Sequence, residues 1–217
     1  MVHPPPQSSA RPLPSALPLQ RADRCTIALF SDTHFWPDGG DFYGGDGNYQ
    51  PLSHTPAILA ALRSEIAAAS PDLAVHLGDL VCGGGTYAMP LPAYEQATDQ
   101  VLDALRTLPC PTYALPGNHD CPPSGGPYTH VERALGIEHG CGFTVDTPFA
   151  RLVLLNAQGH SPKQIDAARP ADPIYGWVHE QELARLDATL ADAGERPVIL
   201  FIHQLLRPWV MDREWRD

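Results

Sequence analysis

Short apolar runs recur along the chain, and polar residues follow each of them. Four runs have the length and aliphatic content of buried β-strands: Thr26–Ser31, Leu73–Leu77, Thr112–Leu115 and Pro197–Ile202. Two more, Phe143–Asp146 and Arg151–Leu155, are separated by a turn around Pro148 and predict a hairpin.

Helical spacing of apolar residues appears between these runs. Thr55 can cap a helix that has Pro56 at its first position, and the apolar stripe of this helix is Ile58, Leu62, Ile66 and Ala69. Two later stripes are Tyr94, Ala97, Val101, Leu105 and Leu108, and then Leu183, Leu186 and Leu190, which end near Gly194. Strands that alternate with helices predict an α/β domain with a largely parallel first sheet.

The first 23 residues differ from the rest of the chain. Six prolines between Pro4 and Pro18 prevent a helix, and no continuous apolar stretch of the signal-peptide kind is present. We expect residues 1–23 to be a disordered Pro-rich tail and residues 24–217 to form one domain. No segment approaches the roughly 20 apolar residues that cross a bilayer, so we expect a cytoplasmic protein without a membrane partner.

Charge and cysteine content narrow the possible partners. The formal net charge of -11 disfavours general binding to nucleic acid, although a buried metal cluster can still attract a small anion. The five cysteines are an odd number and include no Cys-x-x-Cys pair, so neither a zinc knuckle nor a disulfide framework is indicated. Free thiols in a reducing compartment are the expected state.

Residues of the types that commonly bind metals follow four of the predicted strands. They are Asp32 and His34, Asp79, then Asn118, His119 and Asp120, and finally His203. Taken singly, Asp-x-His or Gly-Asp is more often a turn than a ligand pair. Taken together at four strand ends, the carboxylates, the amide and the imidazoles indicate a site for Mn, Fe or Zn. Two such cations, roughly 3.5–4 Å apart and sharing a bridging carboxylate, stabilise both the attacking and the leaving oxygen of a displacement at phosphorus.

The order of these motifs resembles the calcineurin-like metallophosphoesterases. The motifs are Asp32-x-His34, Gly78-Asp79, Gly117-Asn118-His119-Asp120 and His203, and the similarity runs from about Thr26 to His203. The stretch QELARLDATLADAGERPVILFIH is similar to a helix and strand of the class III cyclic-nucleotide phosphodiesterase branch. The resemblance implies an α/β fold in which two mixed β-sheets form a sandwich flanked by helices.

The resemblance also implies a role for each residue. Two divalent metal ions (Mn, Fe or Zn) would be bound, the first by Asp32 and His34 and the second by Asn118 and His203, with Asp79 as the bridge. His119 would protonate or stabilise the leaving oxygen, and Asp120 would orient the His119 imidazole.

The implied reaction is hydrolysis of a phosphate ester. A metal-bridging hydroxide would hydrolyse a small phosphodiester or phosphomonoester, with a cyclic nucleotide or small diester as the preferred substrate class. Loops such as Trp36–His54 would select the substrate.

The sequence departs from the family pattern near its end. The pattern continues with Gly-His-x-His, but 14 residues follow His203 and none of them is histidine. We therefore expect a fold that is incomplete at its C-terminal side, metals that each lack one ligand, and an uncovered sheet that can drive self-association. Substitute ligands are the less favoured explanation; the candidates are His54, His76, His130, His139, His160 and His179.

Two alternatives to an active hydrolase stay open. One is a catalytically crippled fragment, and the other is a non-enzymatic binding scaffold of the same fold. The intact set of ligand-type residues argues against the scaffold, which has no need of it. Between an active enzyme and a crippled fragment the sequence does not decide.

Overall fold

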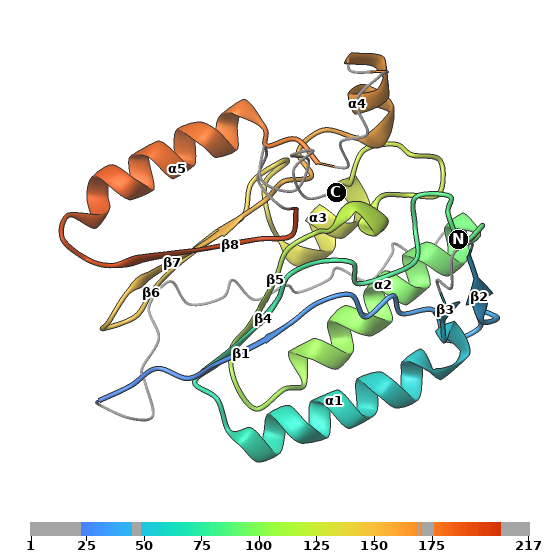
Figure 1. Ribbon diagram of the computed structural model, residues 1–217, viewed down its shortest axis with the longest axis horizontal. Helices are drawn as coiled ribbons and strands as arrows, with labels where there is room; N and C mark the ends of the chain where they lie inside the picture. The colour runs from blue at the N-terminus through green and yellow to red at the C-terminus, as the bar shows by residue number, and fades with distance from the viewer. Residues whose placement is uncertain (1–22, 45–48, 169, 171–175, 205–217) are drawn as a thin grey trace, which may run out of the picture.

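Two three-stranded sheets face each other, and helices cover their outer sides (Figure 1). This arrangement is seen in a computed structural model that describes residues 23–44, 49–168, 170 and 176–204. The predicted tail, apart from Asp23, lies outside the described residues, and so does everything after Gln204.

The first sheet has the strand order β1-β4-β5 and is parallel throughout. Its strands are β1 (Ile27–Phe30), β4 (Leu73–His76) and β5 (Thr112–Ala114). The crossover helices α1 (Thr55–Ala69) and α2 (Leu91–Arg106) both lie on the outer face of this sheet (Figure 1). These elements confirm three predicted strands and two predicted helices. They could be predicted because each strand is a short apolar run and each helix is long enough to show its period.

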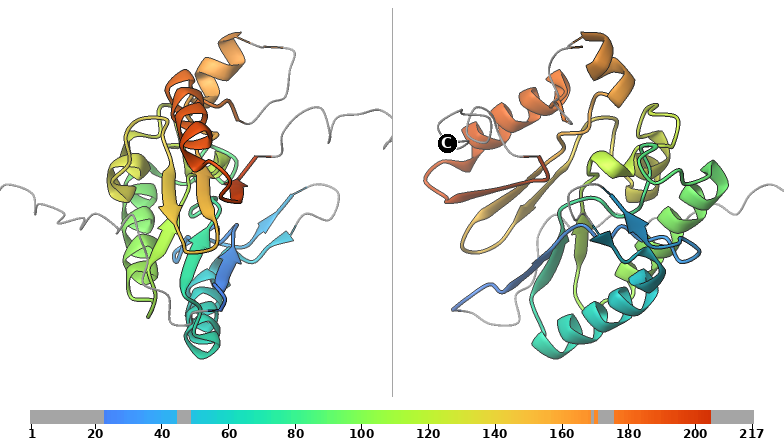
Figure 2. Two further views of the ribbon diagram at one scale, coloured as in Figure 1. Left: turned by 90° about the vertical axis from the view of Figure 1, so that its left-hand side faces the viewer. Right: turned by 45° about the vertical axis from the view of Figure 1, so that its right-hand side comes forward.

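The second sheet is mixed and has the order β6-β7-β8. Strands β6 (Phe143–Asp146) and β7 (Arg151–Leu155) form the predicted antiparallel hairpin, and β8 (Val198–Ile202) pairs in parallel with β7. Helix α5 (Glu180–Ala193) connects the hairpin to β8 and lies on the outside of this sheet (Figure 2). The layers are thus helix, sheet, sheet and helix, which confirms the predicted sandwich.

Several short elements were not predicted from the sequence. They are the antiparallel ribbon of β2 (Phe42–Tyr43) and β3 (Tyr49–Gln50), the helices α3 (Thr129–Leu135) and α4 (Pro162–Ala168), and the 3₁₀ turns Leu52–His54 and Asn118–Asp120. Each has seven residues or fewer, so none spans enough turns or alternations to reveal a period.

Two cores hold these layers together. Leu73 and Val75 of β4 point between the sheets and pack with Leu152 and Leu154 of β7. Ala74, which lies between them in the sequence, points the other way, into the core beneath α1 and α2. Successive side chains of a strand alternate between its two faces, so the central strand β4 is buried on both.

The predicted helix faces needed two corrections. In α1, Leu59 is buried, whereas Ile58 of the predicted stripe is 48% exposed. In α5, Leu183 and Leu190 are 47% and 46% exposed, while Glu182 is fully buried. An apolar stripe fails to predict a helix face when a buried charged residue occupies the position that faces the sheet.

The Glu182 carboxylate has well-defined partners. It accepts hydrogen bonds from the backbone amides of Asn156 (3.0 Å) and Gly142 (3.3 Å), and from Nε of Arg185 (2.6 Å). Buried charges are tolerated when they are paired and hydrogen-bonded in this way. These bonds attach α5 to the second sheet.

Other features of the fold bear on the expectations from composition. All five cysteines are free thiols, as predicted. None of the helices in the described part of the chain has both the length and the apolar character that a membrane span requires. Among the described strands, Leu29 of β1 and Ile199 of β8 are 53% and 44% exposed, so one side of the sandwich is not covered by described residues.

Candidate metal centre

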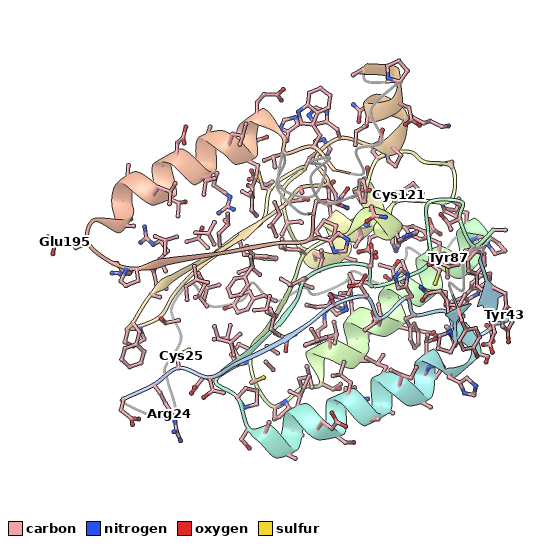
Figure 3. All side chains as sticks on the ribbon, in the orientation of Figure 1. Arg24, Cys25, Tyr43, Tyr87, Cys121 and Glu195 are labelled. Carbon is pink, nitrogen blue, oxygen red and sulfur yellow. The ribbon has the colours of Figure 1, made fainter. Side chains whose placement is uncertain are left out.

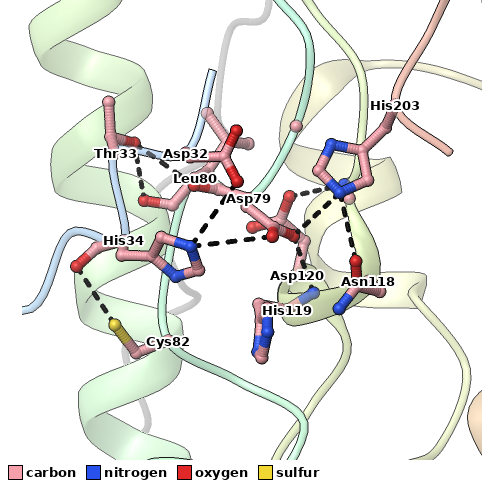
Figure 4. A network of polar contacts seen from close by, with 12 residues as sticks. Asp32, Thr33, His34, Asp79, Leu80, Cys82, Asn118, His119, Asp120 and His203 are labelled. Carbon is pink, nitrogen blue, oxygen red and sulfur yellow. Dashed lines mark hydrogen bonds and ion pairs between the residues drawn. The ribbon is translucent and has the colours of Figure 1, made fainter. Parts of the chain in front are cut away.

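The carboxyl ends of β1, β4 and β5 meet at one edge of the first sheet, and the end of β8 reaches the same place from the second. Asp32 and His34 follow β1, Asp79 follows β4, and Asn118 and His203 follow β5 and β8. Figure 4 shows their side chains directed toward one another. The structure thus brings together all five residues that the sequence predicted as metal ligands.

The backbone at this edge adopts an unusual conformation. Asp32, His34 and Asp79 have positive φ angles of 56°, 41° and 57°. For residues other than glycine, this conformation costs on the order of 1–3 kcal/mol each and persists where the surroundings enforce it. Backbone bonds do so here, since the Asp32 amide donates to Gly78 O and the His34 amide to Asp79 O, both at 3.0 Å.

Two glycines explain how the loops approach so closely. A Cβ atom on Gly78 would lie 2.7 Å from the backbone nitrogen of Gly117, and one on Gly117 would collide with the carboxylate of Asp79. The glycines of Gly78-Asp79 and Gly117-Asn118 therefore let the ligand-bearing loops touch.

Asp79 lies at the middle of the centre. Its Oδ2 is 3.7 Å from Nε2 of His34, and its Oδ1 is 3.5 Å from Nε2 of His203. The backbone amide of His119 also donates to Oδ1 (2.8 Å). One carboxylate that faces imidazoles on two sides has the geometry of a bridging ligand.

The two carboxylates are ionised at neutral pH. Burial raises the pKa of Asp79, but the hydrogen bond and charge of His203 outweigh it, and the pKa is lowered overall. A hydrogen bond from His34 is the main cause that lowers the pKa of Asp32 to about 2. The site therefore offers negative charge to a cation.

His203 is held with one nitrogen turned to the centre. Its Nδ1 lies 3.0 Å from the carbonyl of Leu77, so Nδ1 carries a hydrogen and Nε2 is directed at the centre. Burial lowers the pKa of His203, but the hydrogen bond and charge of Asp79 outweigh it, and the pKa is raised overall. Nε2 is 3.1 Å from Oδ1 of Asn118. That amide oxygen also accepts a bond (2.8 Å) from Gln204, a residue that the sequence analysis did not identify.

His119 lies beside the centre. Its ring is 5.1 Å from the ring of His34, measured between centroids, and burial lowers its pKa. Among the described contacts its Nδ1 is buried without a hydrogen-bond partner. The imidazole is therefore neutral at pH 7.

Asp120 makes different contacts from those predicted. Its carboxylate accepts bonds from the backbone amides of Gly117 (2.7 Å) and Val81 (3.0 Å). Burial, followed by the charge of Asp79, raises its pKa to about 7. The bonds tie the turn that carries His119 to the end of β4, and no described bond joins Asp120 to the His119 ring.

Tyr87 is the main feature of the centre that the sequence analysis missed. Its ring lies 5.2 Å from that of His119 and 5.6 Å from that of His34, and Phe42 packs behind it at 4.9 Å. Figure 3 places Tyr87 at the end of the molecule where the antiparallel ribbon of β2 and β3 lies. An aromatic residue in the loop Val81–Pro92, which follows a strand end, was the available signal.

That loop is anchored rather than loose. The amide of Gly83 donates to His119 O (2.7 Å), and that of Gly84 donates to Cys121 O (3.1 Å). Tyr87 is therefore carried by a segment that is bonded to the His119 turn.

The donor set fits divalent cations. The ligand atoms of Asp32, His34 and Asp79 all lie within 4.8 Å of one another, and Asn118 Oδ1 and His203 Nε2 lie on the other side of Asp79. Carboxylate, amide oxygen and imidazole suit first-row metals. None of the six histidines considered as substitute ligands is part of that three-residue group, within the residues that the structure describes.

Comparison with known protein families gives a match over most of the chain. The family model of the calcineurin-like phosphoesterases matches residues 25–213. A glycerophosphodiester phosphodiesterase, GpdQ, from Enterobacter lignolyticus (strain SCF1) is 29% identical over 196 residues, which are 82% of this chain and 55% of that protein.

A solved structure supports the fold. The crystal structure of a dimetal phosphatase from Danio rerio superposes with a TM-score of 0.58 at 19% identity, covering 85% of this chain and 71% of the other. With the family match over most of its length, the chain belongs to the calcineurin-like phosphoesterase family.

Proposed function

We propose that this chain hydrolyses small phosphodiesters at a dinuclear metal centre. The observation that carries the proposal is the position of Asp79, whose two carboxylate oxygens face His34 and His203 at 3.7 and 3.5 Å. A pair of cations that share one carboxylate is suited to displacement at phosphorus. The chain spans about 55% of the length of GpdQ, so its substrate class is part of the proposal.

The ligands divide into two sets around Asp79. Asp32 and His34 would hold one divalent ion (Mn, Fe or Zn), Asn118 and His203 would hold the other, and Asp79 lies between the two sets. When bound, the two ions supply an attacking water of lowered pKa and neutralise charge on the phosphoryl group. Asn118 is a neutral ligand, so it leaves the centre less repulsive to an anionic substrate.

His119 acts on the leaving oxygen. Because its Nδ1 is buried, Nε2 is the nitrogen that can face the substrate. A hydrogen bond from Nε2 stabilises the developing alkoxide, and the leaving oxygen takes its proton from solvent. Asp120 positions His119 through the backbone of the turn, by its bonds to Gly117 and Val81.

Two observations guide the choice of substrate. GpdQ is by its name a glycerophosphodiester phosphodiesterase, which favours a small diester over a monoester. A cyclic nucleotide is the second candidate, and it is supported by the resemblance of the α5 and β8 sequence alone.

The backbone at the ligands disfavours the alternative of a non-enzymatic scaffold. Asp32, His34 and Asp79 all keep a strained left-handed conformation. A protein that only bound a partner through this fold would gain nothing from that strain.

The test is metal content together with hydrolysis of bis-p-nitrophenyl phosphate in added Mn²⁺. We expect about two Mn²⁺ ions bound at this centre and a rate that falls to background in Asp79→Asn, while the surface control Asp99→Asn keeps both. Equal rates in the parent and Asp79→Asn would refute a phosphodiesterase. A metal-free chain without activity would favour the crippled fragment.

A substrate panel then resolves the class. We expect glycerophosphoethanolamine to be hydrolysed faster than 3′,5′-cyclic AMP, and both faster than p-nitrophenyl phosphate. In His119→Ala, we expect kcat to fall by about 10²–10³ with unchanged metal content. A monoester as the best substrate would overturn the diester assignment.

A further inference from the structure

A second group of metal-binding side chains lies away from the centre described above. It consists of His160, in the loop that follows β7, and His179 and Glu180, at the start of α5. One ligand atom from each lies within 4.8 Å of the other two. No residue is shared with the dinuclear centre. The start of α5 is its right-hand end in Figure 1.

The backbone around His179 is shaped to fit it. A Cβ atom on Gly159 would lie 2.5 Å from Cβ of His179, and one on Gly140 would lie 2.8 Å from it. Any larger residue at either position would displace His179. The segments that contain Gly140 and Gly159 therefore need glycine at these two positions to leave room for the His179 side chain.

The rings of the group are held by stacking. The His160 ring lies 4.6 Å from the ring of Trp177 and 5.3 Å from that of His179, with 33° between the planes in both pairs. Stacking fixes the direction of a ring and lowers the entropy lost when a ligand binds it.

The charge around the group is negative. Glu180 Oε2 is 3.7 Å from Nε2 of His179. The ring of His139 lies 5.4 Å from that of His179, and His139 Nδ1 is 3.0 Å from the Glu132 carboxylate. A helix N-terminus disfavours a cation by only about 0.3–1 kcal/mol, which the adjacent carboxylate of Glu180 offsets.

Capping of α5 is the simplest other role for His179. Its Nδ1 accepts a hydrogen bond of 3.2 Å from the amide of Gln181. Histidine is not among the preferred capping residues, which are Ser, Thr, Asp and Asn, so the cap alone does not explain this choice. A metal at Nε2 would require a hydrogen on Nδ1 and would break the cap, at a cost of about 1 kcal/mol. Binding of Zn²⁺ by a structural site is worth about ten times more.

We propose that His160, His179 and Glu180 form a mononuclear Zn²⁺ site that joins the start of α5 to the loop after β7. Two imidazoles and one carboxylate are a common three-ligand set for Zn²⁺, and a water completes the tetrahedron. The site does not depend on the proposed hydrolase activity, because its ligands are separate from that centre.

The proposal is tested by counting Zn²⁺ ions bound by the full chain in competition with a chromophoric chelator. We expect one Zn²⁺ beyond those held by the dinuclear centre. In His160→Gln and in His179→Asn, this ion should bind more than about 100-fold more weakly, since even an outer-shell change costs 10–100-fold. Asp79→Asn should retain it, and so should the control His54→Gln.

A second measurement separates a metal site from a capping role. Zn²⁺ should accelerate hydrogen exchange at the amide of Gln181 in the parent, because the cap bond is given up, and should not do so in His160→Gln. The proposal is overturned if the parent binds no additional Zn²⁺, or if the additional ion survives both histidine substitutions.

Discussion

His76 makes the stability of this fold dependent on pH in a way that can be measured. The side chain is fully buried in β4, and burial lowers its pKa to about 3. An unfolded histidine has a pKa of about 6.5. Between these values the unfolded chain binds one more proton than the folded chain, so stability is complete above pH 6.5 and falls as the pH drops.

The magnitude follows from the two pKa values. Lowering the pH from 7 to 5 should cost about 2 kcal/mol through His76 alone, because the unfolded state is stabilised by about 1.4 kcal/mol per pH unit below 6.5. This is a large fraction of the 5–15 kcal/mol that stabilises a typical domain.

Urea unfolding at pH 7 and pH 5, with chelator present, measures this effect. His76→Asn keeps an acceptor for the Gly78 amide, which donates to His76 Nδ1 at 3.1 Å, but removes the titrating ring. We expect the stability difference between the two pH values to be about 2 kcal/mol smaller in His76→Asn than in the parent. Thr98→Val, a buried change without a titrating group, should keep the difference of the parent. If His76→Asn and the parent lose equal stability at pH 5, the histidine is not held neutral by burial.

Three further substitutions test separate parts of the structure. Glu182→Ala should lower the free energy of unfolding in urea by about 3–5 kcal/mol, because it leaves Arg185 without its buried partner. The neighbouring Leu183→Ser should lower it by less than about 0.5 kcal/mol, and similar losses in the two variants would contradict the assignment of the helix face. Asp120→Ala should cost about 2–4 kcal/mol in the same assay, since two buried amides lose their acceptor, and a change below 1 kcal/mol would show that water replaces the carboxylate. Tyr87→Leu should lower kcat for bis-p-nitrophenyl phosphate by about tenfold, which corresponds to about 1.4 kcal/mol, while Tyr87→Phe, which keeps the ring, should keep the rate. An equal fall in kcat in both variants would assign the role to the hydroxyl instead of the ring.

The candidate centre could be predicted from the sequence because its residues directly follow strands. A buried strand such as Leu73–His76 is visible as an apolar run, and Gly78-Asp79 comes immediately after it. In parallel strands the carboxyl ends lie at one edge, so positions far apart in the sequence are brought together by topology alone. No side-chain detail was needed for this prediction.

The parts that could not be predicted depend on tertiary contacts. Tyr87 lies in a loop that is placed by backbone bonds to the His119 turn, and no local pattern reports such bonds. The prediction of which side of α5 faces the sheet was wrong, because Glu182 is buried by hydrogen bonds to Gly142 and Asn156, which lie far away in the sequence. Apolar spacing records burial by the hydrophobic effect and misses burial by hydrogen bonding.

His76 also connects the stability of the first sheet to the geometry of the centre. Its Nε2 donates to Thr33 (3.1 Å), whose hydroxyl donates to Leu80 O (2.9 Å), and its Nδ1 accepts from the Gly78 amide. Thr33 lies between Asp32 and His34, and Gly78 precedes Asp79, so one neutral ring braces both of the loops that adopt the strained left-handed conformation. Protonation of Nδ1 would place a hydrogen against the Gly78 amide and break this brace. The same buried ring therefore sets the acid sensitivity of the fold and holds the ligands of the metal centre in place.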